Sequence, residues 1–477
     1  MRSSPRPPLP EGPYLVVGLA RSGLAAARAL RARGERAIGV DAGTPDGLQE
    51  LRDAGVELYL REGGVALLER VGAVIKSPGV PREAPVIAKA LARGMPVLGE
   101  LELGWRLLSN EVIAVTGTNG KTTSVELIGH IHREAGLAVA VAGNVGAALS
   151  GFAGRIDPDV TVVCEASSFQ LQDTEAFAPE AAVLLNIAPD HLDRHGTMEA
   201  YAQAKLQIFA RQSPEDIAVV PAKLSLDFDP PPNLAVDHPS TFSSNPPANL
   251  AVDPRLGVAR RVRFGDDPAA DLCERDGRLW WREGDDDGDP LPLLAVGELR
   301  LRGRHNVQNA MAAAAVCLAR GVDVDAVRAG LRTFAGVAHR LEEVARRDGV
   351  VYVNDSKATN VASALVALDS FPDGVVHLIL GGQAKGQDFS ALRDPVERGC
   401  RAVYLIGEDA PSIAAALAGA NVPVRECGDL EHALKAAAEA ARAGEVILLS
   451  PACASFDQFA DYEARGERFR ELVLAGA

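Results

Sequence analysis

Residues 112–123 read VIAVTGTNGKTT, and this stretch decides how the middle of the chain folds. The apolar run 112–116 predicts a buried strand, and Ser124–Ala135 predicts a helix. A glycine-rich turn between them, followed by Lys-Thr at the helix start, is typical of a phosphate-binding loop. Backbone N–H groups and the helix N-terminus face the phosphates, Lys121 adds a full charge, and the Thr122 hydroxyl is a ligand for Mg²⁺. The residues predicted to bind a nucleotide are Gly117, Thr118, Asn119, Gly120, Lys121, Thr122 and Thr123.

This loop is shorter than the common form. In the common form a glycine lies five positions before the Gly-Lys pair, and here Val115 holds that position. The short form argues against most ATPases and GTPases. The alternative is a plain Gly/Asn turn that happens to precede a lysine, and the strand and helix on either side argue against it.

Length and composition favour a globular protein with several domains. The 477 residues suffice for roughly three domains of ~150 residues. A net charge of -15 argues against nucleic acid as a partner, and no uncharged apolar run reaches the ~18 residues of a membrane span. The six cysteines are scattered without a CxxC pair, which favours a reducing compartment and argues against a zinc cluster. We therefore expect a cytoplasmic protein.

Strand and helix patterns alternate along the chain, which predicts an α/β protein with mostly parallel sheets. The predicted domains are 1–109, 110–335 and 336–477. We expect the first to be Rossmann-like, the second to be a P-loop-type ATPase domain, and the third to be Rossmann-like again. Within the second, Leu299–Leu301 predicts a short strand, and the stretch 221–261, rich in Pro, Asn and Asp, predicts an irregular loop.

The first unit carries a turn that is similar to a dinucleotide fingerprint. The sequence GLARSG at Gly18–Gly23 follows an apolar strand, and Asp41 ends the next strand, where a ribose-binding acid would lie. Ala20 stands in place of the second glycine and hinders close approach of a pyrophosphate, which argues against NAD. A tight turn between strand and helix without any ligand is the alternative.

Polar residues end two further strands of the second unit. Glu165 lies at the edge where open α/β sheets bind ligands, which makes it a candidate Mg²⁺ ligand beside Thr122. A helix cap formed by the two serines that follow is the alternative for this segment. The segment LLNIAPDHLDRH at 184–195 ends another strand, and His191 is its candidate metal or phosphate ligand, although a lone histidine is more often structural.

Lysine is scarce in this chain. Only eight of the 49 basic residues are lysine, and four of these lie in the motifs, namely Lys121, Lys205, Lys357 and Lys385. Because arginine is the default surface base here, these positions need a compact amine or a modification that arginine cannot undergo. For Lys205, a plain surface lysine on a helix is the alternative.

Four more polar segments lie at helix starts or strand ends. The helix start GRHNVQN at 303–309 offers Asn309 in addition to a capping residue. The segments NDSKATN at 354–360, GGQAKGQDF at 381–389 and SPACASFDQF at 450–459 each follow an apolar strand. We expect these three to meet at one edge of the third sheet.

In this order, the motifs together resemble the Mur ligase family. They are GTNGKTT, SSFQL, DHLDRH, HNVQN, the His-Arg pair at 339–340, NDSKATN and SPACASFDQF. The resemblance runs from about Tyr14 to the C-terminus and is weakest over 221–300. NDSKATN together with SPACASFDQF is specific to the branch that adds D-glutamate, and the Asn-Pro-Arg motif of branches that add diaminopimelate or lysine is absent from the sequence.

The resemblance implies a ligase that joins D-glutamate to UDP-N-acetylmuramoyl-L-alanine in peptidoglycan precursor synthesis. ATP phosphorylates the substrate carboxylate, the amine of D-glutamate attacks the acyl phosphate, and ADP and phosphate are released. The resemblance also implies two Mg²⁺ ions. We further expect a monomer with no nucleic-acid or membrane partner.

The resemblance also implies residue roles, carried over position by position. Thr122 and Glu165 hold one Mg²⁺, and His191 holds a second together with Lys205, which is N-carbamylated in the family. The implied catalytic residues are Lys121, Glu165, His191, Lys205 and Lys357. The implied further nucleotide contacts are Asn309, Arg340 and Asp355. The implied contacts of the UDP-linked substrate are Gly18, Leu19, Ala20, Arg21, Ser22, Asp41 and Asn144, and those of D-glutamate or its surroundings are Lys357, Thr359, Lys385, Ser455, Phe456 and Tyr462.

Three alternatives stand beside this hypothesis. A folylpolyglutamate synthase or another ligase of the superfamily is one, and the N-terminal UDP domain, which folate ligases lack, argues against it. A non-catalytic ATP-binding homologue is the second, and the intact set of catalytic residues argues against it. An NAD-dependent dehydrogenase is the third, and the phosphate loop in the middle unit argues against it.

Overall fold

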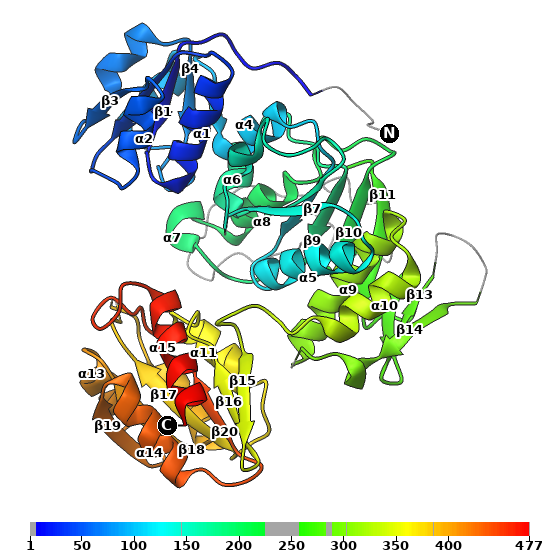
Figure 1. Cartoon of the computed structure of the whole chain (residues 1–477), viewed down its shortest axis with the longest axis vertical. Coiled ribbons are helices and arrows are strands. Elements are labelled where there is room, and N and C mark those ends of the chain that lie inside the picture. Colours follow the sequence, from blue (N-terminus) through cyan, green and yellow to red (C-terminus); the bar gives the residue numbers. More distant parts are fainter. Residues whose placement is uncertain are drawn as a thin grey trace, which may run out of the picture. The chain divides into compact units, whose positions relative to one another are not determined.

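The computed structural model describes residues 6–144, 146–224, 257–282, 289–301, 303–384 and 386–476. Within them the chain forms a five-stranded, a nine-stranded and a six-stranded sheet, which Figure 1 colours from blue to red along the sequence. The predicted α/β class with three sheet-based domains is confirmed, whereas the borders proposed at 109/110 and 335/336 stay predictions. By internal contacts the chain divides into two compact units, the first of residues up to Glu298 with Gln308–Thr333, the second of Leu299–Val307 with residues from Phe334 on.

The first sheet is wholly parallel, in the order β3-β2-β1-β4-β5. Its strands are β1 Tyr14–Val17, β2 Ala37–Asp41, β3 Glu57–Leu60, β4 Ala73–Lys76 and β5 Val97–Gly99. Its helices are α1 Arg21–Ala32, α2 Leu48–Asp53, the 3₁₀ turn η1 Val65–Arg70 and α3 Pro85–Ala92, and α4 Glu100–Leu107 follows β5.

Strand pleating buries both faces of this sheet. Tyr14 and Val16 pack with residues of α1 and α2 on one face, whereas Leu15 and Val17 pack with residues of η1 and α3 on the other. Successive strand residues point to opposite faces, so a continuous apolar run is what a sheet covered on both sides needs. The turn after β1 is thereby fixed at the carboxyl edge of the sheet.

The second sheet runs in the order β14-β13-β12-β11-β10-β9-β6-β8-β7. Its strands are β6 Val112–Thr116, β7 Val139–Gly143, β8 Thr161–Glu165, β9 Ala181–Leu184, β10 Ile217–Pro221, β11 Arg260–Gly265, β12 Leu272–Arg275, β13 Arg278–Trp281 and β14 Leu291–Ala295. Its helices are α5 Lys121–Glu134, α6 Ser168–Gln172, α7 Leu192–His195, α8 Met198–Leu206, α9 Arg304–Ala319 and α10 Val324–Thr333, with the 3₁₀ turns η2 Leu149–Phe152 and η5 Val296–Glu298. Strand β6 pairs in parallel with β8 and β9, so the phosphate loop begins at the end of an interior strand of the sheet.

The far edge of this sheet differs from the prediction. Strands β12, β13 and β14 pair antiparallel, and the strand predicted at Leu299–Leu301 is wrong. The last strand is β14, because Leu293 and Leu294 supply the buried side chains, and Leu299–Leu301 is an irregular connection. Of the loop predicted over 221–261, residues 225–256 lie outside the described residues.

The third sheet has the order β15-β16-β20-β17-β18-β19, parallel except for β15. Its strands are β15 Glu342–Arg347, β16 Val350–Asn354, β17 Val376–Gly381, β18 Cys400–Ile406, β19 Val424–Gly428 and β20 Val446–Leu449. Its helices are α11 Val361–Leu368, α12 Arg393–Gly399, α13 Ala410–Ala416, α14 Leu430–Ala440 and α15 Tyr462–Ala475, with the 3₁₀ turn η6 Ser390–Leu392. No helix within the described ranges is long and apolar enough to cross a membrane.

A buried ion pair joins the first sheet to the second within the first unit. Lys76 ends β4, and its Nζ lies 2.5 Å from Oδ2 of Asp173, which follows α6. Both side chains are 5% exposed or less, and Arg82 also approaches Asp173 at 3.4 Å. Removal of one partner of such a pair leaves a charge in a medium that solvates it poorly.

We expect Lys76→Met to destabilise the first unit by about 3 kcal/mol, the lower end of what such a loss costs, because Arg82 still pairs with Asp173. Arg28→Met is the matched control. It breaks the pair with Glu50, whose members are 41% and 61% exposed, and should cost at most about 1 kcal/mol. Calorimetric unfolding of the purified variants measures both effects, and equal losses would contradict the buried pair's special cost.

Candidate active site

A cleft of about 400 Å³ lies at the carboxyl ends of β1 and β4. Sequence order reverses between these neighbouring strands, which is where open α/β sheets bind ligands. Six of the residues predicted to contact the UDP-linked substrate line it, namely Gly18, Ala20, Arg21, Ser22, Asp41 and Asn144. The seventh, Leu19, has its side chain in the core beneath. The cleft also contains residues that sequence reasoning missed, namely Ser77, Pro78, Gly79, Val80 and Gln170.

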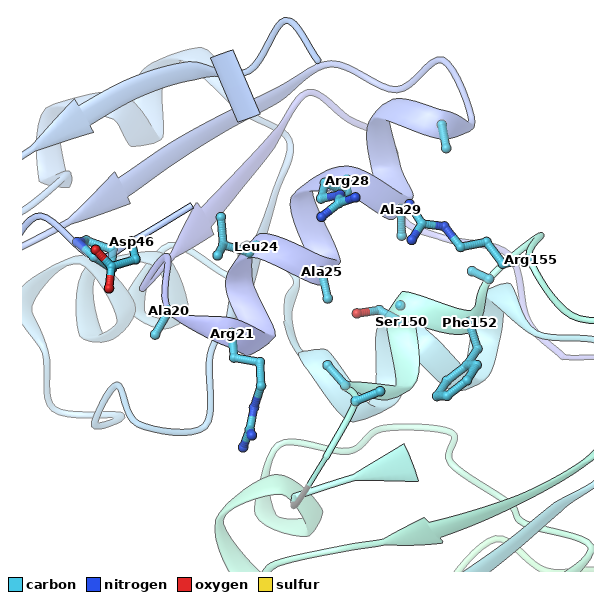
Figure 2. Close-up of a pocket in the computed structure, with 16 residues that line it drawn as sticks. Ala20, Arg21, Leu24, Ala25, Arg28, Ala29, Asp46, Ser150, Phe152 and Arg155 are labelled. Atoms are coloured by element: carbon cyan, nitrogen blue, oxygen red, sulfur yellow. The ribbon is translucent and has the colours of Figure 1, made fainter. Parts of the chain in front are cut away.

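Asp41 holds the turn after β1 in place. Its Oδ2 accepts a hydrogen bond from Leu19 N at 2.6 Å, and its Oδ1 accepts one from Gly43 N at 2.7 Å. Arg21 projects from the first turn of α1 (Figure 2), and its guanidinium donates to the carbonyl of Asn144 at 3.1 Å. The turn therefore presents a cation beside a carboxylate that the backbone already stabilises.

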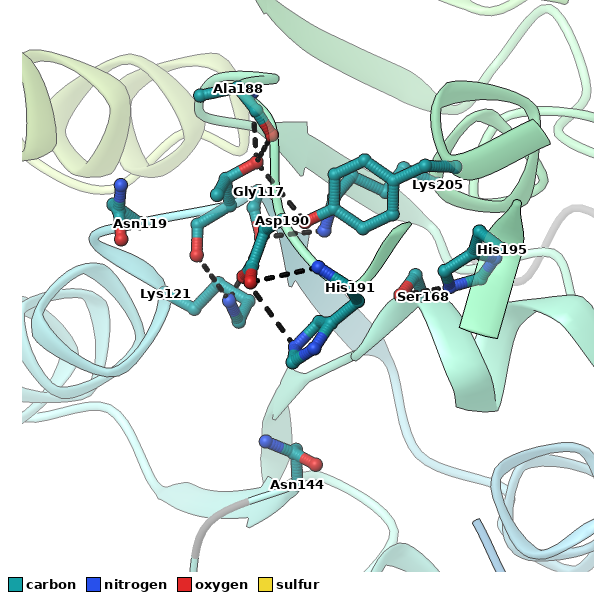
Figure 3. Close-up of polar contacts among 12 residues, drawn as sticks. Gly117, Asn119, Lys121, Asn144, Ser168, Ala188, Asp190, His191, His195 and Lys205 are labelled. Atoms are coloured by element: carbon teal, nitrogen blue, oxygen red, sulfur yellow. Dashed lines mark hydrogen bonds and ion pairs between the residues drawn. The ribbon is translucent and has the colours of Figure 1, made fainter. Parts of the chain in front are cut away.

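The phosphate loop is held by a residue that follows β9, a strand paired with β6. Asn186, just after β9, accepts hydrogen bonds from the N–H groups of Thr118 and Asn119 and donates one to the carbonyl of Asn119. Lys121 Nζ donates to the carbonyls of Gly117 and Thr118 at 2.9 and 2.8 Å. The loop is thus held in shape by Asn186 and by its own Lys121, whose contact with Gly117 is drawn in Figure 3.

Glu165 and Thr122 meet at the loop, as predicted. The Thr122 hydroxyl donates to Glu165 Oε2 at 2.7 Å, and Asn144 Nδ2 donates to Oε1 at 3.0 Å. Carboxylate and hydroxyl oxygens at this spacing match the ligands that Mg²⁺ prefers. The helix cap weighed as the alternative also exists, because Ser167 and Gln170 form a capping box at α6. Glu165 and this cap are separate features of one segment.

Lys205 is not a surface residue. It is 1% exposed, its Nζ donates to the carbonyl of Gly117 at 2.7 Å, and the Tyr201 ring lies 4.5 Å from Nζ. Burial, and next to it the charge of Lys121, lowers the pKa of Lys205 from 10.5 to about 7. The lowered pKa favours the neutral amine, and a neutral amine is a nucleophile.

Tyr201 connects Lys205 to the loop, which sequence reasoning missed. Its hydroxyl lies 3.1 Å from Thr118 Oγ1, and burial raises its pKa to about 12. The His195 ring lies beside the Tyr201 ring. Its Nε2 is hydrogen-bonded to Ser168 Oγ at 3.0 Å, and the ring stacks on Phe169. The position of Tyr201 one helical turn before Lys205 was the available signal.

His191 lies at the start of α7 in the left-handed region, with φ 51°. Its Nε2 is 3.5 Å from Oδ2 of Asp190, and the ring is half exposed. Figure 3 shows Asp190, His191 and Lys205 near the loop, and the charges of Asp190 and Glu165 both act on Lys205. The described residues contain no cluster of three His, Cys, Asp or Glu side chains that could hold a metal ion. A second metal here needs another anionic ligand.

The second unit gathers its polar segments at one sheet edge. Strands β16, β20 and β17 are neighbours, and Ser450, after β20, donates to Oδ2 of Asp355, after β16, at 2.8 Å. Gly381 N, at the end of β17, bonds to the carbonyl of Pro451. The predicted meeting of these three segments is confirmed. Burial raises the pKa of Asp355 to about 7, against the pull of its hydrogen bonds and of Arg340.

The residues predicted around D-glutamate differ in exposure. Lys357 Nζ lies 3.6 Å from the centroid of the Tyr462 ring, a cation–π contact. Ser455 is buried, whereas Phe456 is 59% exposed. Thr359 follows Lys357 in the same turn. Lys385 lies outside the described residues.

Arg465 of α15 holds this edge together, and sequence reasoning missed it. It is 1% exposed. Its guanidinium donates to the hydroxyl and carbonyl of Ser356 and to the carbonyls of Cys453 and Ala454. It therefore fixes the ends of β16 and β20 against each other. The only signal in the sequence was that Arg465 lies three residues after Tyr462, which was predicted near D-glutamate.

Comparisons with known proteins agree with this geometry. The family description "Mur ligase middle domain" matches residues 115–227, "Mur ligase, glutamate ligase domain" matches 339–453, and "Mur ligase MurD-like, N-terminal domain" matches 13–99. A UDP-N-acetylmuramoylalanine–D-glutamate ligase of Acidobacterium capsulatum is 41% identical over 470 residues, which cover 97% of this chain and 96% of that protein. The chain belongs to the Mur ligase family.

Further Mur ligases extend the comparison. The ligase of the same name from Salinibacter ruber is 42% identical, over 96% of each chain. Among solved structures, the UDP-N-acetylmuramate–alanine ligase of Thermotoga maritima superposes with a TM-score of 0.57 at 18% identity, over 98% of this chain and 100% of that one. The MurF ligase of Thermotoga maritima in complex with ADP gives 0.55 at 18% identity, over 93% and 96%. At this identity the two structures support the fold alone.

Gly120 offers a test of the loop geometry. Its φ is +84°, and a Cβ there would overlap Oδ1 of Asn309, whereas Gly136, with φ +69°, has open space around it. Both Gly→Ala changes carry left-handed strain of about 1–2 kcal/mol, but only Gly120→Ala displaces Asn309. We expect Gly120→Ala to weaken ATP affinity about tenfold or more, since 1.4 kcal/mol corresponds to tenfold, and Gly136→Ala to leave it unchanged. Calorimetric ATP titration measures both, and unchanged affinity in Gly120→Ala would show that the loop tolerates a side chain there.

Proposed function

We propose that this protein joins D-glutamate to UDP-N-acetylmuramoyl-L-alanine in an ATP-dependent reaction of peptidoglycan synthesis. The observation that carries the proposal is its 38% to 42% identity, over nearly the whole length of both chains, to ligases named for that reaction. The N-terminal substrate cleft supports a nucleotide-linked substrate. This argues against a folylpolyglutamate synthase and against an NAD-dependent dehydrogenase.

The proposed chemistry has two steps. A carboxylate oxygen of the nucleotide substrate attacks the γ-phosphorus, and the bond to ADP breaks. The amine of D-glutamate then attacks the acyl carbon, loses a proton, and expels phosphate as the C–N bond forms. Such a transfer needs positioning and neutralised charge more than covalent help from the protein.

The first unit holds ATP and the reacting carboxylate in this proposal. The loop 117–123 with Asn309 binds the phosphates. Lys121 neutralises charge on the transferred group, exchanging its present carbonyl partners for phosphate oxygens. Thr122 and Glu165 would hold Mg²⁺, and the ion would supply positive charge that offsets the charge of the phosphates.

Lys205 has the properties that carbamylation requires. The neutral amine adds to the carbon of CO₂, a C–N bond forms, and a proton leaves, so that a buried cation becomes a carboxylate-like anion. The lowered pKa makes the neutral amine available, and arginine cannot undergo this reaction. The carbamate would give His191 the anionic companion that a second Mg²⁺ needs.

The second unit supplies the remaining residues. Arg340 and Asp355 contact the nucleotide, and Lys357, held over the Tyr462 ring, pairs with a carboxylate of D-glutamate. Thr359, Lys385, Ser455 and Phe456 line the amino-acid site in this proposal. The predicted monomeric state and cytoplasmic location stay predictions.

The decisive experiment is phosphate release by purified protein with ATP, Mg²⁺, UDP-N-acetylmuramoyl-L-alanine and one amino acid at a time. We expect release with D-glutamate and none with L-glutamate or diaminopimelate. Lys121→Met is the control and should lower kcat by about 10²–10³-fold, the scale of losing one aligned charge or donor. Release with another amino acid and not with D-glutamate would overturn the proposal, and no release with any would favour the non-catalytic homologue.

Carbamylation has its own test. We expect Lys205→Ala and Lys205→Arg to lose activity, and short carboxylates such as acetate to restore part of the activity of Lys205→Ala only. Carbon-13 NMR of protein equilibrated with labelled bicarbonate should show a carbamate signal that strengthens from pH 6 to 8, because the amine deprotonates about pH 7. Lys205→Arg lacks the signal. Full activity of Lys205→Arg would show that no carbamate is needed.

A further inference from the structure

We propose that a second cleft of the first unit, between α1 and the segment 147–155, binds a small aromatic phosphate. We call it the α1 cleft. Its volume is about 570 Å³, within the range of about 300–1,000 Å³ typical of ligand sites. It lies on the side of α1 away from the first-sheet core, and of its lining only Ala20 and Arg21 also belong to the substrate cleft. The reaction proposed above uses no other residue of it.

The walls of the α1 cleft are smooth and apolar. Small side chains dominate both, and Leu24 and Phe152 add larger apolar surfaces (Figure 2). A Cβ added to Gly151 would lie 3.8 Å from the Cβ of Ala25, so at this point the gap between the two walls has room for about one methyl group. Walls built mainly of methyl groups are smooth, and a flat ring packs on a smooth wall better than a branched aliphatic group does. The small residues of the two walls are Ala25, Ala29, Ala32, Ala147, Ala148, Gly151 and Ala153.

The rim of the α1 cleft is cationic. Three arginines line it, Arg21, Arg28 and Arg155, against one acid, Asp46. In a chain with net charge -15 this is a local reversal of sign. Arg155 forms no side-chain hydrogen bond or ion pair among the residues described, and the one ion pair of Arg28, with exposed Glu50, is solvated. The planar guanidinium of arginine can donate two parallel hydrogen bonds to phosphate oxygens, so we infer that the anion bound here is a phosphate.

A buried contact makes one wall rigid. Ser150 donates to Oε1 of Glu100 from both its N–H and its hydroxyl, at 2.8 and 2.7 Å. Glu100 is 1% exposed and its Oε2 has no hydrogen-bond partner. Burial raises the pKa of Glu100, which favours the neutral acid. This buried carboxyl therefore cancels less of the charge of Arg21, and its hydrogen bonds hold Ser150 of η2 in place.

The α1 cleft is coupled to the substrate cleft through Arg21. Arg21 lines both clefts, so an anion bound in one cleft reduces the attraction of this residue for an anion in the other. The two ligands should oppose each other's binding by the same factor, as thermodynamic linkage requires. This coupling rests on the proposed function of the substrate cleft, whereas binding to the α1 cleft does not.

The test uses 1-naphthyl phosphate as the probe, with binding to the whole protein followed by calorimetry. Two control ligands test the ring and the phosphate of the probe separately. 1-Naphthol has the ring without the phosphate, and inorganic phosphate has the charge without the ring. We expect the probe to bind at least about tenfold more tightly than either. As the UDP concentration rises to saturation, the Kd of the probe should increase by a few fold and then stay constant. If UDP competes without limit, the probe occupies the substrate cleft and the proposal fails.

Variants locate the bound probe. Arg155→Gln removes one cation, and Ala25→Leu fills space between the two walls. Each should weaken probe binding about fivefold or more, while phosphate release with D-glutamate remains. Arg52→Gln, an exposed arginine outside the cleft, is the matched control and should change neither. Unchanged probe affinity in both Arg155→Gln and Ala25→Leu would overturn the proposal. Loss of phosphate release in the wild type, with probe binding intact, would count against the proposed function only.

Discussion

The parallel pairing of β6 between β8 and β9 is the constraint on which the active site depends. Parallel strands end at the same edge, so the loop after β6, Glu165 at the end of β8 and Asn186 after β9 must lie together. The contacts of Thr122 with Glu165 and of Asn186 with the loop follow from this. Buried strands on both sides prevent the loop from shifting. The sheet thus determines where charge can be concentrated.

Burying charged groups at this edge costs solvation free energy, and burial shifts the pKa of such groups toward their neutral forms. Burial, and next to it the charge of Lys121, lowers the pKa of Lys205 to about 7. In the second unit burial acts on an acid instead and raises the pKa of Asp355 to about 7. Both groups are poised to change charge near neutrality, which is common among groups that handle phosphates and protons.

Local patterns were enough to predict the three α/β units and the turn between a strand and a helix at residues 117–120. The positions of Glu165 and of the three segments of the third sheet were also predictable, since each ends or follows an apolar strand. Lys205 lies on helix α8 and was noticed only because lysine is scarce in this chain. Long-range partners were not. Asn186 and Arg465 act on residues distant in sequence, and nothing in their own neighbourhood specifies those partners. The prediction of a strand at Leu299–Leu301 was wrong for a related reason. Two leucines separated by one residue form part of a strand only where a neighbouring strand pairs with them.

The order of strands in the third sheet has a consequence for how this unit is made. Strand β20 lies between β16 and β17 but is the last strand in the sequence, and Arg465, which fixes its end, follows later still. During synthesis β16 and β17 leave the ribosome long before the strand that separates them. Until it arrives, each has an unpaired edge on that side, a state prone to wrong pairing. The proposed amino-acid site is therefore completed only after β20 and Arg465 have both been made.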